Sequence, residues 1–308
     1  MPWRKGHKLK LVPENQAQGR VREIFEEVKR TLGIPYLDDF YQALGAYPAF
    51  LEMHWKAVRP IAQSQQFFAL AARLRADAYT RMHSYFEIPD LCARITDMQF
   101  SPGAREELTG VVELSHYSDP LMLLLVAAQF QAFESPFGQD ELPRVPASHP
   151  VFSERPCLIE EDTATPRVKK IYDEVKRAMD LPFTPLVFRA TGRWPDFLTV
   201  YWETLRTILR SPVYEGCHYG VRESAFALTR EFPSVIDLTL PQLTDAGIDD
   251  EQLASVVRIC DLFVDALGST VLNVSLAKIA LEGGTRAGAE PHKRVPQPAT
   301  AGKGDQAA

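Results

Sequence analysis

The sequence predicts an all-α protein, an internally duplicated helical bundle with pseudo-two-fold symmetry. Two observations carry this prediction: apolar residues recur at the spacing of a helix face in most of the chain, and the first half of the sequence recurs in the second. The content of 45% apolar and 24% charged residues is ordinary for a globular chain. Strand-like alternation is confined to one short stretch, 235–240, so we do not expect a sheet.

The duplication is visible as a motif that returns at constant spacing. Glu-Glu-Val-Lys-Arg ending at Arg30 recurs as Asp-Glu-Val-Lys-Arg ending at Arg177, a shift of 147 positions. The same shift holds without an insertion through several further pairs: Val21 and Val168, Pro35 and Pro182, Gly45 and Gly192, Pro48 and Pro195, Trp55 and Trp202. A run of this length does not arise by chance, so two copies of one unit are predicted.

Within each unit the apolar pattern is helical. One apolar helix face is formed by Val21, Ile24, Phe25, Val28 and Leu32, and its counterpart repeats after residue 165. Helix starts are indicated where a cap residue precedes proline, as at 101–102 and 165–166, and Pro48 and Pro195 are expected to begin second helices. The predicted organisation is an N-terminal arm (1–11), a first helical repeat (12–131), a linker (132–158), a second helical repeat (159–282) and a disordered tail (283–308).

Composition and motifs narrow the class of protein. The net charge of −6 does not favour nucleic acid, and the longest apolar run, 121–128, is too short to cross a bilayer. The four cysteines form no CxxC pair, and no nucleotide-binding, serine-hydrolase or zinc-protease motif is present. We therefore expect a cytoplasmic protein with a small-molecule substrate and neither cofactor nor metal, while a homodimer or a small partner subunit stays open.

Polar residues that break the internal symmetry are the candidates for chemistry. The strongest break is in the loop after Pro35, where Asp38 and Asp39 stand opposite Pro185 and Leu186. A carboxyl group in an apolar, aromatic loop has a raised pKa, which suits a general base. The alternative is that one of the two aspartates is simply a helix N-cap.

A second break follows the apolar stretch 108–114. His116-Tyr-Ser-Asp-Pro120 stands opposite a region that contains Asp261, so His116 and Asp261 are candidates for polar groups in one pocket. The alternative makes His116 a helix-end residue, Asp119-Pro120 an ordinary turn, and Asp261 part of a buried hydrogen-bond network.

The order of these features resembles a known family. A helix, a proline-containing loop, an aromatic-Pro pair, a second helix and an apolar helix ending in polar-Tyr-x-Asx-Pro-x-x-Leu-Leu-Leu, all duplicated, are similar to the group I, DehI-type 2-haloacid dehalogenases over most of residues 12–280. The resemblance implies an all-α fold with the active site between the halves. It also implies that an Asp of the second half activates water and that an Asn of the first half holds that water.

Carried over to this chain, the family's Asn position falls on His116, and its Asp position falls on Val187 or Phe188, neither of which is a base. The family's catalytic stretch instead resembles the first half, where Asp39-Phe40 and Gln-Ala-Leu are both present with one residue between them. The resemblance therefore predicts Asp39 as the base, with His116 or Asp261 as its polar partner. The further residues expected to contact substrate are Tyr36, Asp38, Phe40, Tyr117, Val187 and Asp261.

The predicted activity is nucleophilic substitution at a saturated carbon that carries a leaving group, as in 2-haloacid dehalogenation. Two alternatives stay open. One is a biosynthetic cyclase, in which the substrate's own amine displaces a sulfate or halide to close an aziridine-type ring. The other is a non-catalytic binding protein, or a subunit that depends on a partner, with the same fold.

Overall fold

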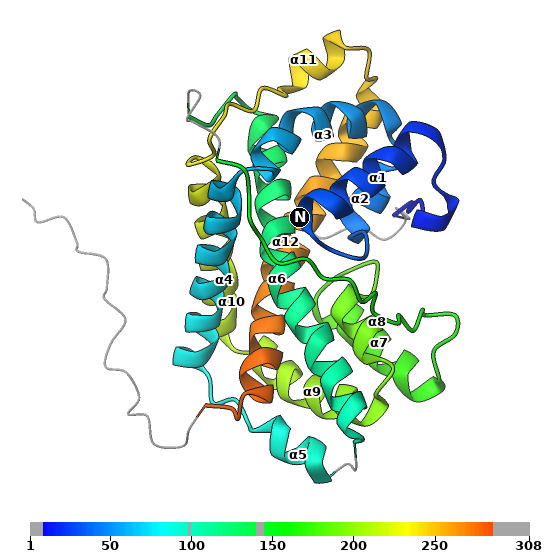
Figure 1. Ribbon diagram of the computed structural model, residues 1–308, viewed down its shortest axis with the longest axis vertical. Coiled ribbons are helices and arrows are strands. Elements are labelled where there is room, and N and C mark those ends of the chain that lie inside the picture. The colour runs from blue at the N-terminus through cyan, green and yellow to red at the C-terminus, as the bar shows by residue number, and fades with distance from the viewer. Residues whose placement is uncertain (1–8, 98–99, 140–144, 286–308) are drawn as a thin grey trace, which may run out of the picture.

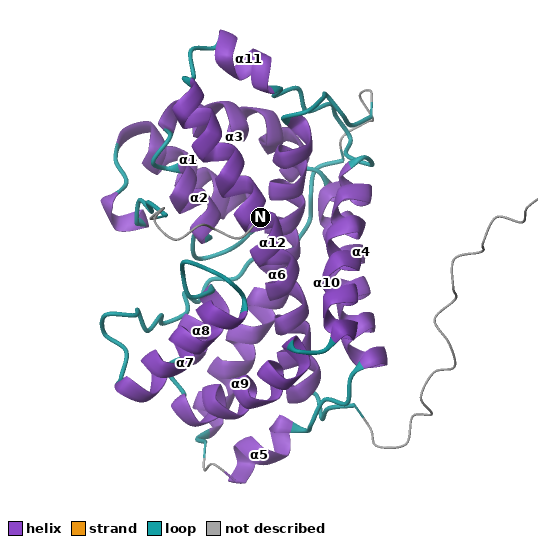
Figure 2. Cartoon of the chain, turned by 180° about the vertical axis from the view of Figure 1, so that it is seen from behind, coloured by secondary structure: helices purple, strands orange, loops and turns teal. Residues whose placement is uncertain are grey.

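The computed structural model describes residues 9–97, 100–139 and 145–285, and within them the protein is built of helices without a strand (Figures 1 and 2). The prediction of an all-α fold is confirmed. A short 3-10 helix, Glu14–Gln16, precedes the first unit. The helices of the first half are α1 (Gly19–Leu32), α2 (Asp39–Leu44), α3 (Pro48–Ala62), α4 (Gln65–Tyr85), α5 (Leu91–Asp97) and α6 (Pro102–Ala132). The helices of the second half are α7 (Pro166–Ala178), α8 (Leu186–Thr191), α9 (Pro195–Leu209), α10 (Pro212–Thr229), α11 (Leu240–Asp245) and α12 (Asp250–Leu281).

The two series have the same order of long and short helices. The bounds of α8 and α9 follow those of α2 and α3 at the shift of 147 positions found in the sequence. Hydrogen bonds recur at the same shift: the Trp55 indole donates to Glu27 over 2.8 Å, and the Trp202 indole donates to Glu174 over 2.8 Å. These equivalences support the proposed division into two repeats.

Local chemistry explains where the helices begin. The side chains of Ser101, Thr165 and Asp249 each accept a bond from a backbone N–H in the first turn of the helix that follows, which satisfies a donor that has no partner within the helix. Prolines in the first turn of six helices lack the N–H that would otherwise need a partner there.

The long helices α6 and α12 form the centre of the molecule. They pack more extensively against each other than any other pair, and both views show them side by side (Figures 1 and 2). Helices α4 and α10 cover one flank, while α1–α3 and α7–α9 lie toward opposite ends of the other (Figure 1). Helices α6 and α12 have the length and composition of membrane spans, but 89% of each apolar window is buried, as in the core helix of a folded domain.

The short strand candidate 235–240 forms no strand: Ile236 makes a single bridge to Phe137, and α11 begins at Leu240. Two local expectations differ from the structure. The Asp119-Pro120 pair is not a turn; it lies inside α6, where Pro120 is tolerated within the continuous helix. Pro48 begins the third helix of its repeat, because the short α2 precedes it. Residues 1–8 of the predicted arm and 286–308 of the predicted tail lie outside the described part of the chain.

Candidate active site

A small cavity lies between the two halves, where α2 and α8 approach the central helices α6 and α12. Its volume is about 20 Å³, enough for one water molecule. Its lining residues come from both repeats: Asp38, Asp39, Asp119, Phe183, Pro185, Leu186, Val187, Phe263, Ala266, Leu267 and Thr270. Three carboxyl groups therefore meet at an otherwise largely apolar site that both halves build.

Asp38 combines a structural role with a free carboxyl oxygen. It is the N-cap of α2, and its Oδ1 accepts a bond from the backbone N–H of Phe40 over 2.8 Å. Burial, and then the neighbouring Asp39, raises the pKa of the Asp38 carboxyl to about 7. The capping interpretation and the cavity interpretation thus apply to the same side chain.

Asp39 is the first residue of α2 and forms an ion pair across the two halves. Its Oδ2 lies 2.5 Å from Nη2 of Arg189 on α8, and both side chains are nearly buried, at 5% and 11% exposure. Burial raises the pKa of Asp39, while the charge and hydrogen bond of Arg189 act in the opposite direction. The pKa of Asp39 is raised overall because burial outweighs the arginine, and the ion pair with Arg189 engages the Oδ2 oxygen of this carboxyl.

Asp119 is a site residue that the sequence analysis assigned to a turn. It projects from the middle of α6, and its Oδ1 accepts a bond from Ser118 Oγ over 3.3 Å. Ser118 is in turn 2.6 Å from the hydroxyl of Tyr36. Burial, and then the charge of Asp38, raises the pKa of Asp119 well above its ordinary value. The signal that could have found it is a single acidic residue within the largely apolar stretch 114–132 of α6.

Other predicted contact residues have mixed positions. Val187 lines the cavity, and Phe40 packs edge-on against the cavity residue Phe263, with ring centres 5.6 Å apart. Tyr36 reaches the site through Ser118. Tyr117 does not line the cavity; its hydroxyl donates to the backbone oxygen of Leu32, and its ring packs on Phe152.

The structure does not place His116 or Asp261 in the cavity. Because α6 is continuous through Pro120, His116 lies on a face directed at α4 and the end of α12, with its ring 6.1 Å from Tyr79. Burial, and then the charges of Arg75 and Lys278, lowers the pKa of His116 to about 4. Asp261 is half-buried on α12, whereas the cavity face of that helix carries Phe263, Ala266, Leu267 and Thr270. Neither residue is positioned as the partner of Asp39.

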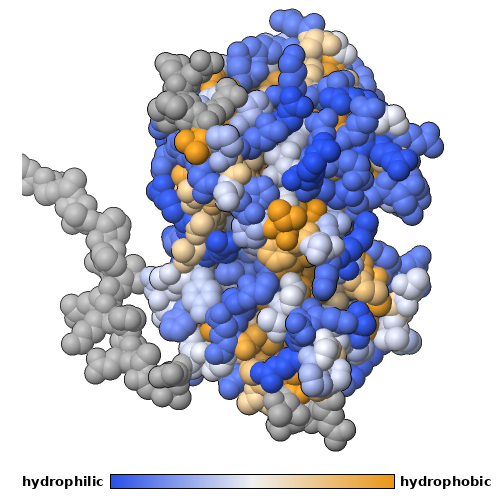
Figure 3. Space-filling model, viewed as in Figure 1, coloured by the Kyte–Doolittle hydropathy of each residue, from blue (hydrophilic) through white to orange (hydrophobic). Residues whose placement is uncertain are grey.

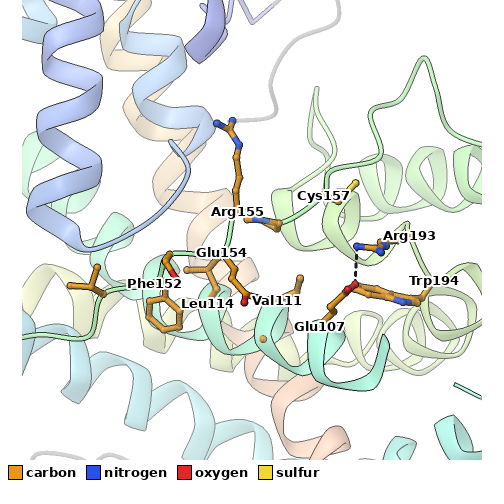
Figure 4. A pocket seen from close by; sticks show the side chains of 13 residues that line it. Glu107, Val111, Leu114, Phe152, Glu154, Arg155, Cys157, Arg193 and Trp194 are labelled. Carbon is orange, nitrogen blue, oxygen red and sulfur yellow. Dashed lines mark ion pairs between the residues drawn. The ribbon is translucent and has the colours of Figure 1, made fainter. Parts of the chain in front are cut away.

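A larger pocket of about 600 Å³ opens on the surface between α6, residues 151–157 and the turn before α9 (Figure 4). Both arginines that line it form ion pairs: Arg193 pairs with Glu107 over 2.8 Å, and Arg155 pairs with Glu14 over 2.9 Å. The chemistry of the small interior cavity, with three buried carboxyls, makes that cavity the candidate active site.

The face shown in Figure 3 is mainly hydrophilic, with separate small apolar patches.

Among the described residues, no group of three His, Cys, Asp or Glu side chains is arranged to hold a metal ion. What the cavity offers instead is proton transfer. Asp38 and Asp119 are carboxyls whose pKa values are raised by burial, and Arg189 compensates the charge of Asp39.

Fold and site together define a class: an internally repeated α-helical protein with an acid-lined cavity between its repeats. Solved structures of D-2-haloacid dehalogenase have a similar fold. A mutant of that enzyme superposes with a TM-score of 0.86 at 24% identity, covering 91% of this chain and 98% of that one. A complex of D-2-haloacid dehalogenase with L-LA gives a TM-score of 0.83 at 23% identity, covering 91% and 100%.

Sequence comparison agrees with this class. The family described as halocarboxylic acid dehydrogenase DehI matches residues 35–183. The (R)-2-haloacid dehalogenase of Pseudomonas putida is 24% identical over 87% of this chain and 91% of its own length. A configuration-inverting 2-haloacid dehalogenase of Alcaligenes xylosoxydans xylosoxydans is 21% identical over 89% and 94%. The chain is thus similar to the DehI family in sequence over residues 35–183 and to D-2-haloacid dehalogenase in fold over 91% of its length.

Proposed function

We propose that this protein catalyses hydrolytic displacement of a halide from the saturated α-carbon of a small 2-haloacid. The observation that carries the proposal is the cavity between the repeats, in which three buried carboxyls surround space for one water molecule. The curated relatives described above are 2-haloacid dehalogenases, and their sequence matches cover 87% and 89% of this chain.

Asp38 is the proposed general base. Its Oδ1 is occupied by the Phe40 N–H, which fixes the carboxyl, and the remaining oxygen is available to the cavity. A base with a pKa near 7 is ionised in a large fraction of molecules at neutral pH yet still binds a proton well. The assignment moves from Asp39 to its neighbour, because Asp39 is held by Arg189.

The proposed reaction is a single displacement. The oxygen of the cavity water forms a bond to the α-carbon, the carbon–halogen bond breaks with its electron pair leaving on the halide, and the water proton passes to Asp38. The products are a 2-hydroxyacid, a halide ion and a proton that Asp38 returns to solvent. Attack opposite the leaving group inverts the configuration at that carbon.

Purified protein supplied with each enantiomer of 2-chloropropionate tests the proposal. The expected result is equal molar amounts of chloride and of 2-hydroxypropionate, with inverted configuration. Binding without chloride release from either enantiomer would overturn the proposed reaction and favour a non-catalytic protein. Ring formation from an amine that carries a sulfate or halide on the neighbouring carbon, in place of chloride release, would favour the cyclase alternative.

A further inference from the structure

Arg189 connects the wall of the cavity with the molecular surface. Its Nη2 is bonded to Asp39, which lines the cavity, and its Nη1 lies 3.2 Å from Glu160, whose side chain is 50% exposed. The guanidinium itself is 11% exposed. Arg189 is therefore positioned behind one wall of the candidate active site, on a line of charges that leads outward.

The two repeats carry different residues at the position of Arg189. At the shift of 147 positions Arg189 corresponds to Gln42, and both side chains contact Asp39. Gln42 Nε2 donates to the backbone oxygen of Leu37 over 3.0 Å and lies 3.4 Å from Asp39 Oδ1. One repeat thus supplies a neutral donor to Asp39, and the other supplies a cation.

The hydrogen bonds of Arg189 leave one donor without a protein acceptor. Its Nε is buried and has no such partner, whereas its Nη2 is bonded to Asp39. The Nε–H and one terminal N–H form the guanidinium edge that binds a carboxylate through two parallel hydrogen bonds. Asp39 is bonded to Nη2 and Glu160 to Nη1, so the Nε–H is the donor left for a further carboxylate, together with the second N–H of Nη2.

The positive charge of Arg189 matters because the ionisable groups that line the cavity are acidic. Three carboxyls line the cavity, and Arg189 is the cation that acts on Asp38 and Asp39 among the described residues. An anionic substrate that enters such a site is repelled unless a positive charge faces it. A three-carbon acid is also larger than a water-sized cavity, so its binding must displace lining side chains, and Asp39 is the lining residue behind which Arg189 lies.

We propose that Arg189 is the specificity-determining residue that binds the carboxylate of the substrate, using the Nε–H together with a terminal N–H. Asp39 remains on the guanidinium or turns to Gln42, which already lies beside it. This inference rests on the proposed function and names the group by which its substrate is selected: a small acid is accepted, and the corresponding neutral amide is not.

Binding of unreactive ligands tests the role of Arg189 separately from catalysis. We would measure the affinity of propionate and of propionamide by calorimetry for the intact protein, Arg189→Gln, Arg189→Lys and the control Arg193→Gln. Glutamine is the residue that the first repeat has at this position, and Arg193 forms a surface ion pair with Glu107. Arg189→Gln should weaken propionate binding by about 10- to 100-fold, the usual effect of losing charge-assisted hydrogen bonds.

Propionamide affinity should be weak and equal in all four proteins, Arg193→Gln should bind propionate normally, and Arg189→Lys should bind with intermediate affinity. Normal propionate affinity in Arg189→Gln, or equal loss of both ligands together with a lowered melting temperature, would overturn the inference. Intact protein that binds no propionate would also overturn it. Carboxylate binding that depends on Arg189 in a protein that releases no halide would leave this inference standing while the proposed reaction failed.

Discussion

At the scale of single residues, the neighbours Asp38 and Asp39 show how environment separates two identical side chains. Both are buried at the start of α2, and burial raises the pKa of each. Arg189 binds Asp39 directly, whereas Asp38 is fixed by a backbone N–H and faces the cavity. The side chain bonded to the arginine links the two halves, and the one without that bond is the proposed base.

The pH dependence of turnover should report the proposed base. Asp38 accepts a proton only when ionised, so kcat should rise with pH through about 7 and level off above it. Initial rates of halide release between pH 5 and 9 measure this profile. A rate that is constant down to pH 5 would mean that a carboxyl with an ordinary pKa acts as base.

The same raised pKa affects stability in the opposite sense. Folded protein keeps a proton on Asp38 up to about pH 7, whereas the unfolded chain releases it near 3.8, so the folded state binds more protons between these values. The contribution of Asp38 to stability is therefore full below about pH 4 and is lost as the pH rises to about 7. Turnover is therefore expected to rise with pH over this range, while the contribution of Asp38 to stability falls.

At the scale of elements, the continuity of α6 decides which polar residues meet. Pro120 indicates a turn in the sequence, but an environment buried on all sides favours a helix that runs from Pro102 to Ala132. The helix directs Asp119 to the cavity and His116 to α4 and α12. The sequence pattern located the polar segment, and the error lay in the local structure assigned to it.

The indole hydrogen bonds between α1 and α3, and between α7 and α9, provide a test of the repeat at this scale. Glu27→Ala and Glu174→Ala should each lower the free energy of unfolding by about 1–3 kcal/mol, because each leaves a buried Trp N–H without its acceptor. Denaturant unfolding measures both. Substitution of the exposed Glu203 is the control, and a large loss in one repeat with none in the other would argue against structural equivalence.

At the scale of the whole molecule, the duplication was the most informative feature of the sequence. It depends on many residues along the chain, so errors at single positions do not obscure it, and helix bounds such as those of α3 and α9 repeat at the predicted shift. Contacts between the halves could not be obtained this way. The Asp39–Arg189 pair joins positions 150 residues apart, and a repeat pattern says which residues are equivalent, not which ones face each other.

The site is asymmetric although the two repeats that form it are equivalent. Equivalent elements α2 and α8 approach one cavity from the two repeats, and one carries Asp38 and Asp39 where the other carries Pro185 and Leu186. Each half supplies a different part of a single site. The apolar surfaces of α8 and α12 exclude water and thereby raise the pKa of the carboxyls on the other side.

Single-turnover halide release by Asp38→Asn tests the central claim most directly. Asparagine keeps the capping oxygen and removes proton acceptance, so the chemical step should slow by about 10²–10⁴-fold with little change in substrate affinity. The controls are His116→Ala and Asp261→Asn, which change residues outside the cavity and should leave the rate within about threefold of the unaltered protein, since neither supplies the base. A near-normal rate in Asp38→Asn, or a loss as large in either control, would contradict the account.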